Sequence, residues 1–131
     1  MGLVALVGVL LLSGAKSTPG VSAANVPAAG DVWFGTSFDP TTFAIAQRAT
    51  TFSTSQAVAA VIHLTRSVDG SELSIRSYWN GTLLATSALS WSGTGDVWGT
   101  TLGPALGAGD WRYEFVDVGG NVLASGQITV Q

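Results

Sequence analysis

Apolar side chains alternate with polar ones through much of this sequence, and this period of two limits the possible folds more than any other feature. The clearest run is Trp111, Tyr113 and Phe115, which alternate with Arg112 and Glu114. Alternation places the two sets of side chains on opposite faces of a β-strand, whereas an amphipathic helix repeats every ~3.6 residues. Downstream of the N-terminal region, no long window has a helical apolar stripe. The sequence therefore predicts an all-β protein.

Turn residues separate the alternating runs. Asn80-Gly81 lies between two of them, and this pair favours the positive φ angles of a tight hairpin. Gly119-Gly120 marks a second hairpin. Short runs with a turn every ~8–12 residues are typical of a two-sheet antiparallel sandwich. We expect about seven to eight strands, at 32–37, 43–46, 57–66, 72–79, 82–88, 96–102, 110–117 and 121–130.

The end of the chain resembles a known family. Ala108–Asp117 begins with AGDWRY and is followed by a Gly turn and by VLASG at Val122–Gly126. This hairpin resembles the closing hairpin of bacterial extracellular immunoglobulin-like and fibronectin-III-like modules. The resemblance implies an immunoglobulin-like sandwich in which Tyr113 or Trp111 packs at the corner between the sheets. It implies no particular ligand, because this architecture carries many functions.

The first 23 residues have the pattern of an export signal. An apolar run at 2–12 is followed by small and polar residues that end in Val21-Ser22-Ala23, so we expect cleavage between Ala23 and Ala24. The basic residue that usually comes first is missing, and Lys16 follows the run. A truncated membrane anchor or an apolar N-terminal helix are therefore alternatives, although the run is shorter than the ~20 residues that span a bilayer.

These patterns divide the chain into three parts. Residues 1–23 are the signal peptide or truncated anchor, 24–30 are a flexible leader, and 31–131 are the immunoglobulin-like sandwich. We expect the sandwich to be secreted or held at the cell surface. An exported domain of this size with no cysteine favours a bacterial source, because comparable eukaryotic domains often carry disulfides.

Charge excludes two classes of partner. After residue 23 the chain has no lysine, and its four arginines are set against eight acids, so the net charge is 4 − 8 = −4. An acidic surface disfavours nucleic acid and anionic lipid. We therefore expect no nucleic-acid partner, and membrane contact only through the N-terminal segment if it is uncleaved.

Catalytic residues are scarce. The one histidine, His63, has no cysteine to activate, and no serine lies in a Gly-x-Ser-x-Gly motif. Most acids lie at turns, where Asp caps its own backbone. The oxygen-rich Asp69–Glu72 segment lacks the spacing of an EF-hand loop, so a β-turn explains it better than a calcium site. We predict no enzyme, no metal site and no cofactor; an enzyme would need a cleft that joins His63 to a carboxylate.

Tryptophan is abundant. The five are Trp33, Trp79, Trp91, Trp98 and Trp111. Trp111 shares a face with Tyr113 and Phe115 and is expected in the core. Trp33 and Trp98 each follow Gly-Asp-Val, which suggests two strands that begin with a turn Asp and an apolar plug.

Three aromatic residues near loops are candidates for stacking on a ligand: Tyr78, Trp79 and Trp91. Tyr78 and Trp79 are adjacent in one strand, so they point to opposite faces and one of them is expected at the surface. Trp91 lies between two serines beside Gly93. Exposed aromatic rings at loop ends stack on sugars or on partner proteins.

Three functions are consistent with these features. The first is a non-catalytic module with a structural, adhesion or protein-binding role. The second is a small carbohydrate-binding module that uses the loop-end aromatics, with a cell-surface glycan as partner. The third is an enzyme. Exposure of Trp79 and Trp91 separates the first two, and sheet edges offer a further route to protein partners by strand addition.

Overall fold

The structure is a computed structural model that describes residues 25–131. The predicted signal peptide or anchor at 1–23 lies outside the described residues. Within residues 25–131, no helix is long and apolar enough to cross a bilayer.

Strands make up most of the described chain. They are β1 (Val32–Gly35), β2 (Ser37–Phe38), β3 (Ile45–Ala46), β4 (Thr51–Phe52), β5 (Val58–Asp69), β6 (Ser74–Trp79), β7 (Thr82–Ala88), β8 (Thr94–Gly103), β9 (Gly109–Val116) and β10 (Val122–Val130). All eight predicted strands are present, although the first is divided into β1 and β2. The strand that was not predicted, β4, has two residues.

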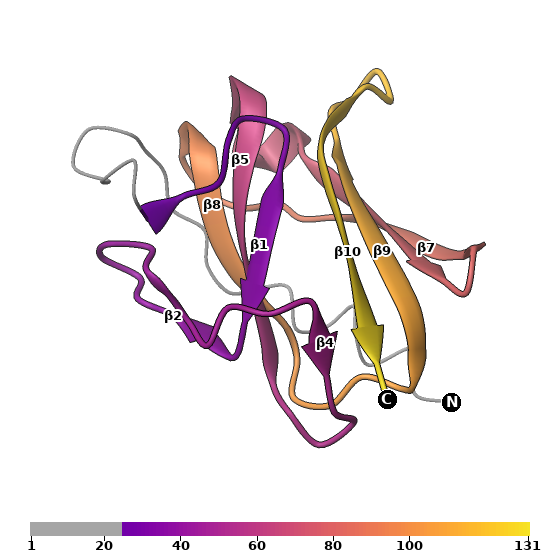
Figure 1. Cartoon of the computed structure of the whole chain (residues 1–131). Coiled ribbons are helices and arrows are strands. Elements are labelled where there is room, and N and C mark those ends of the chain that lie inside the picture. The colour runs from indigo at the N-terminus through magenta and orange to yellow at the C-terminus, as the bar shows by residue number, and fades with distance from the viewer. Residues whose placement is uncertain (1–24) are drawn as a thin grey trace.

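Two main sheets face each other, as Figure 1 shows. One has the order β4-β10-β9-β6-β7 and the other the order β1-β5-β8. With β1, β5 and β8 in one sheet and β6, β7, β9 and β10 in the other, this is an immunoglobulin-like sandwich. β2 and β3 form a third, two-stranded sheet.

One pairing departs from the predicted antiparallel arrangement. β4 runs parallel to β10, with Thr51 opposite Thr129 and Phe52 opposite Val130. The start of β1 already bridges β10 in a parallel sense, through Asp31 and Ser125. β1 belongs to the three-stranded sheet and β4 to the five-stranded sheet, yet both run parallel to β10.

The main core fills the space between the two large sheets. Its largest fully buried side chains include Trp98, Trp111, Tyr113, Phe115 and Ile62. Trp111 and Tyr113 stack with ring centroids 6.2 Å apart and planes 8° apart. The Trp111 indole N–H donates to the Gly107 carbonyl at 2.8 Å. Burial raises the pKa of the Tyr113 hydroxyl far above its usual value. Trp111 and Tyr113, the two alternatives for the aromatic between the sheets, are thus both buried.

The first part of β5, residues 58–62, is buried on both faces, whereas its sequence predicted one buried face. Its even positions, such as Ile62, face the main core, whereas Val61 on the other face joins a second cluster with Phe43 and Val97. Phe38 and Ile45 pack on that cluster, so the β2-β3 hairpin covers the outer side of the three-stranded sheet. This is why the less apolar face of β5 is not at the surface.

Candidate functional site on the outer face of the five-stranded sheet

Cross-strand pairing brings polar side chains together on the outer face of the five-stranded sheet. Tyr78 on β6 lies opposite Arg112 on β9, and Arg112 lies opposite Gln127 on β10. In the next row, Arg76 lies opposite Glu114. Trp111 and Tyr113, the intervening residues of β9, point into the core. Alternation along the strands therefore puts these polar side chains on the side away from the core.

Glu114 is the centre of this polar cluster. Only 8% of its surface is exposed. Its carboxylate accepts hydrogen bonds from the Tyr78 hydroxyl at 2.9 Å, from Arg76 at 3.4 Å and from Arg112. The Arg112 guanidinium also lies over the Tyr78 ring, 4.2 Å from its centroid. Glu114 thus holds one aromatic ring and two cations in fixed positions.

The environment keeps Glu114 ionised. Burial by itself raises the pKa of Glu114, but hydrogen bonds from Tyr78, Arg112 and Arg76 and the charge of Arg112 outweigh it and leave the pKa below 4.5, its usual value. A carboxylate is therefore present at neutral pH, and its charge balances part of the two guanidinium charges.

A hollow of about 290 Å³ lies beside this cluster. Its lining is Tyr78, Asn80, Gly81, Asp110, Trp111, Arg112 and Gln127. We name it the Tyr78 hollow. Asn80 Oδ1 accepts from the Asp110 backbone N–H at 2.9 Å, and Asp110 Oδ1 accepts from the Thr129 hydroxyl at 3.0 Å. Hydrogen bonds within the protein therefore fix the side chains of Asn80 and Asp110 beside the hollow.

A second hollow of about 260 Å³ also borders Gln127. Its lining is Val32, Trp33, Phe34, Arg48, Ala49, Thr50 and Gln127. We name it the Trp33 hollow. Arg48 lies over the Trp33 ring, 3.7 Å from its centroid, so this hollow repeats the arginine-on-aromatic arrangement of the first. Trp33, at the start of β1 after its Gly-Asp-Val motif, is half-buried.

The three predicted stacking residues have different environments. Tyr78 is partly exposed on the outer face and lines the Tyr78 hollow. Trp79 points the other way, as alternation predicted, and it packs on the rim of the core. Its indole N–H donates to Ala108 O at 3.0 Å, and its ring lies 6.4 Å from that of Trp111.

Trp91 is buried, so its ring is not available to a ligand at the surface. It is 4% exposed and stacks on Trp98 with centroids 5.2 Å apart. The absence of a side chain at Gly70 makes room for this stack, since a Cβ there would lie 2.8 Å from Trp91 Cβ and 2.8 Å from the Trp98 ring. The flanking serines suggested a solvent-facing loop, but the backbone returns to Gly70, whose carbonyl accepts from Trp91 N–H at 3.2 Å.

His63 does lie beside a carboxylate. Its Nε2 is 3.4 Å from Asp96 Oδ2, and its Nδ1 is 2.8 Å from the Pro27 carbonyl. Through these two contacts the imidazole joins the leader to β8. Among the described residues, no three His, Cys, Asp or Glu side chains gather as a metal site would require.

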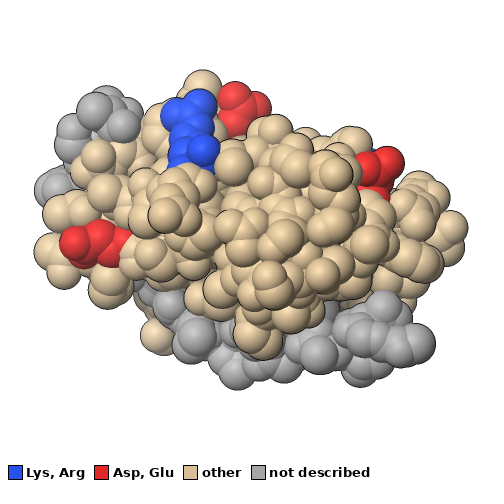
Figure 2. Space-filling model, turned by 60° about the horizontal axis from the view of Figure 1, so that its bottom comes forward, with Lys and Arg blue, Asp and Glu red and all other residues tan. Residues whose placement is uncertain are grey.

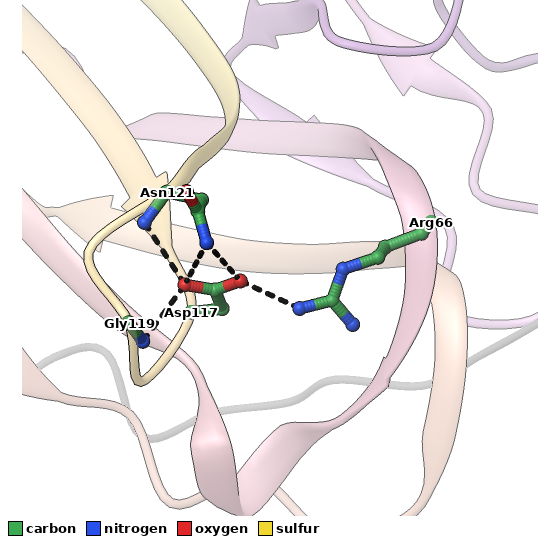
Figure 3. Close-up of polar contacts among 4 residues, drawn as sticks. All are labelled: Arg66, Asp117, Gly119 and Asn121. Atoms are coloured by element: carbon green, nitrogen blue, oxygen red, sulfur yellow. Dashed lines mark hydrogen bonds and ion pairs between the residues drawn. The ribbon is translucent and has the colours of Figure 1, made fainter.

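Three acids cap the backbone of their own turns, as predicted: Asp39, Asp69 and Asp117. Asp96 and Asp110 instead lie in β8 and β9 and contact other side chains. In Figure 3, Asp117 Oδ1 accepts from the backbone N–H groups of Gly119 and Asn121, each at 2.9 Å, and Oδ2 accepts from Arg66 at 2.6 Å. Hydrogen bonds from Asn121, with smaller contributions from Arg66 and Gly119, hold the pKa of Asp117 well below its usual value. Asp69 likewise accepts from Ser71 N–H at 2.9 Å in the segment considered for calcium.

Strand β7 forms the outer edge of the five-stranded sheet, as Figure 1 shows. Among the described strands, β7 pairs with β6 alone. Leu83 is 48% exposed and Leu84 is 36% exposed. Thr82–Ala88 contains no charged residue and no proline. Sequence reasoning identified this strand with its bounds but could not identify it as an edge.

Charged side chains are sparse on the face shown in Figure 2. A basic group lies next to an acidic one at the edge of this face, and further acidic groups are scattered among uncharged residues. This face therefore has no continuous basic patch of the kind that binds phosphate backbones.

The comparisons identify no family. No protein-family model matches the chain, and no curated protein matches it. The resemblance of the closing hairpin to extracellular immunoglobulin-like modules therefore stays a prediction, and function has to be inferred from the surfaces described above.

Proposed function

We propose that this chain is an exported, non-catalytic immunoglobulin-like module of the bacterial extracellular type that binds a protein partner through strand β7. The partner would add an extended segment to the sheet beside β7. Export is inferred from residues 1–23, and the non-catalytic role is supported by the engagement of both His63 nitrogens.

The exposed edge carries this proposal. An edge strand presents a row of unpaired backbone N–H and C=O groups, which another extended chain can satisfy. Soluble proteins usually protect long edges with charges, prolines or bulges. β7 has neither charge nor proline, although its pairing with β6 contains one bulge, between the Ser77–Ala85 and Tyr78–Leu83 pairs. Leu83 and Leu84 are both exposed. These leucines would bury apolar area against a partner.

The other sheet edges are less suitable. β4 has two residues, and the edge of β1 is partly used, since Ala49 N–H donates to Phe34 O at 3.0 Å. β8 is largely buried, with Trp98 and Thr100 fully so. β7 is therefore the strand that combines length with exposure.

The proposal is tested by the size of the native complex. Protein produced from the full coding sequence in its source cells is separated by size-exclusion chromatography and detected by antibody. We expect the wild type to elute as a complex larger than a monomer and Leu84→Lys to elute as a monomer. The matched control is Val118→Lys, because Val118 is 81% exposed but lies in the β9-β10 turn, and it should elute like the wild type. A monomeric wild type, or a Leu84→Lys complex of unchanged size, would contradict the proposal.

A further inference from the structure

We propose that the Tyr78 hollow and the Trp33 hollow are two adjoining subsites for neighbouring rings of a neutral glycan. This inference is independent of the proposed role of β7. It rests on the lining of the hollows, on their shared residue Gln127 and on the balance of charge around the Tyr78 hollow.

The Tyr78 hollow offers both hydrogen-bond donors and acceptors. Asp110 Oδ1 is used by Thr129, and Asn80 Oδ1 by the Asp110 backbone. Within the described part of the chain, Asp110 Oδ2 and the Asn80 amide nitrogen make no hydrogen bond, so both can bind a ligand. Sugar hydroxyls donate and accept at once, so an adjacent carboxylate and amide suit a pair of hydroxyl groups.

Charge and polarity disfavour other ligands. The two cations of the cluster, Arg76 and Arg112, are balanced by two acids, Glu114 and Asp110. A strongly anionic ligand therefore gains little attraction at the Tyr78 hollow, whereas Arg48 adds one positive charge at the Trp33 hollow. A wholly apolar ligand would remove the carboxylate and amides from water without replacing their hydrogen bonds, which is costly. A neutral polyhydroxylated ligand avoids both penalties.

The shared residue Gln127 and the small size of each hollow both favour two subsites over one. At about 290 and 260 Å³, each lies just below the ~300–1,000 Å³ range of sites for drug-sized ligands, so each fits a small ring better than a whole oligosaccharide. Gln127 is exposed and lines both, so one amide can contact two neighbouring rings.

Each subsite has an aromatic ring held by an arginine. Arg112 covers one face of Tyr78, and Arg48 covers one face of Trp33. A guanidinium above a ring points its N–H groups outward in its plane, where they can donate to sugar hydroxyls. Glu114 acts as a positioning residue, because its hydrogen bonds hold Tyr78 and Arg112 without its lining the hollow.

The test is titration followed by NMR of the backbone amides, the Trp33 indole N–H and the Gln127 side-chain amide. The probes are cellobiose, maltose and N,N′-diacetylchitobiose, with glucose and digalacturonate for comparison. We expect at least one neutral disaccharide to shift the signals of both Trp33 and Gln127. Glucose should bind at least about tenfold more weakly, a difference of ~1.4 kcal/mol.

Variants separate this inference from its alternatives. Tyr78→Ala, Trp33→Ala and Gln127→Ala should each weaken disaccharide binding at least about tenfold. Trp79→Phe is the matched control, since Trp79 packs on the core rim and lines neither hollow. Leu84→Lys should keep glycan binding even if it loses the protein partner. The inference is overturned if no probe binds, if the acidic disaccharide binds best, or if binding depends on one hollow alone.

Discussion

At the scale of single residues, Glu114 has the greatest influence on the outer face. Two arginines and a tyrosine converge on this one buried carboxylate. Removing a buried acceptor leaves its donors without partners, which typically costs more than the hydrogen bond contributes. The positions of Tyr78 and Arg112, which line the Tyr78 hollow, should therefore depend on Glu114, which does not line it.

Glu114→Gln should lower the free energy of unfolding at neutral pH by about 1–3 kcal/mol, because Arg76 and Arg112 lose their counter-charge.

The pH dependence gives a second prediction. The pKa of Glu114 is lowered by folding, so its contribution to stability is present above 4.5 and is lost as the pH falls through the folded-state pKa. Denaturant unfolding across this range should show a smaller acid-induced loss in Glu114→Gln than in the wild type. Equal losses in the two proteins would refute the role given to Glu114.

At the scale of elements, local sequence patterns predicted much of the fold. Asn80 and Gly81 both adopt positive φ, of 50° and 85°, and the hairpin they form joins β6 to β7 as expected. Alternation also placed Tyr78 and Trp79 on opposite faces. These features depend on neighbours within a few residues, which the sequence displays directly.

Other elements depend on distant pairing, which one sequence does not display. β4 has two residues and exists because β10 lies beside it. The Glu114 cluster requires the register between β6 and β9, which sets residues 76 and 78 beside 112 and 114. The sequence displays the polar alternation within β6 and within β9, but it does not display how the two strands are aligned. The burial of Trp91 also depends on distant structure, since its backbone returns to Gly70.

The β2-β3 hairpin provides a prediction at this scale. Gly99 lets the Phe38 ring lie directly on the three-stranded sheet, because a Cβ there would be 2.5 Å from the ring. Gly99→Ala should displace Phe38 and lower stability by about 1–3 kcal/mol, the typical cost of overpacking. Amide hydrogen exchange should show the loss of protection concentrated in 37–46. Unchanged protection there would mean that the hairpin does not depend on this contact.

At the scale of the whole molecule, the sandwich presents two separate surfaces on its five-stranded sheet. One is the uncharged edge of β7, and the other is the outer face around Gln127. A module with both could hold a protein partner at its edge while contacting a glycan with its face. Of the two, we propose β7 as the protein-binding element.

Photocrosslinking tests that claim most directly. A benzophenone side chain is placed at position 84 in β7 or at the exposed control position 118, and cells that produce the protein are irradiated before the products are identified by mass spectrometry. If β7 binds a protein, position 84 should give one dominant crosslinked polypeptide, either another protein or a second copy of the chain, and position 118 should not. If the two positions give the same products, or if position 84 gives none, β7 is not the binding edge.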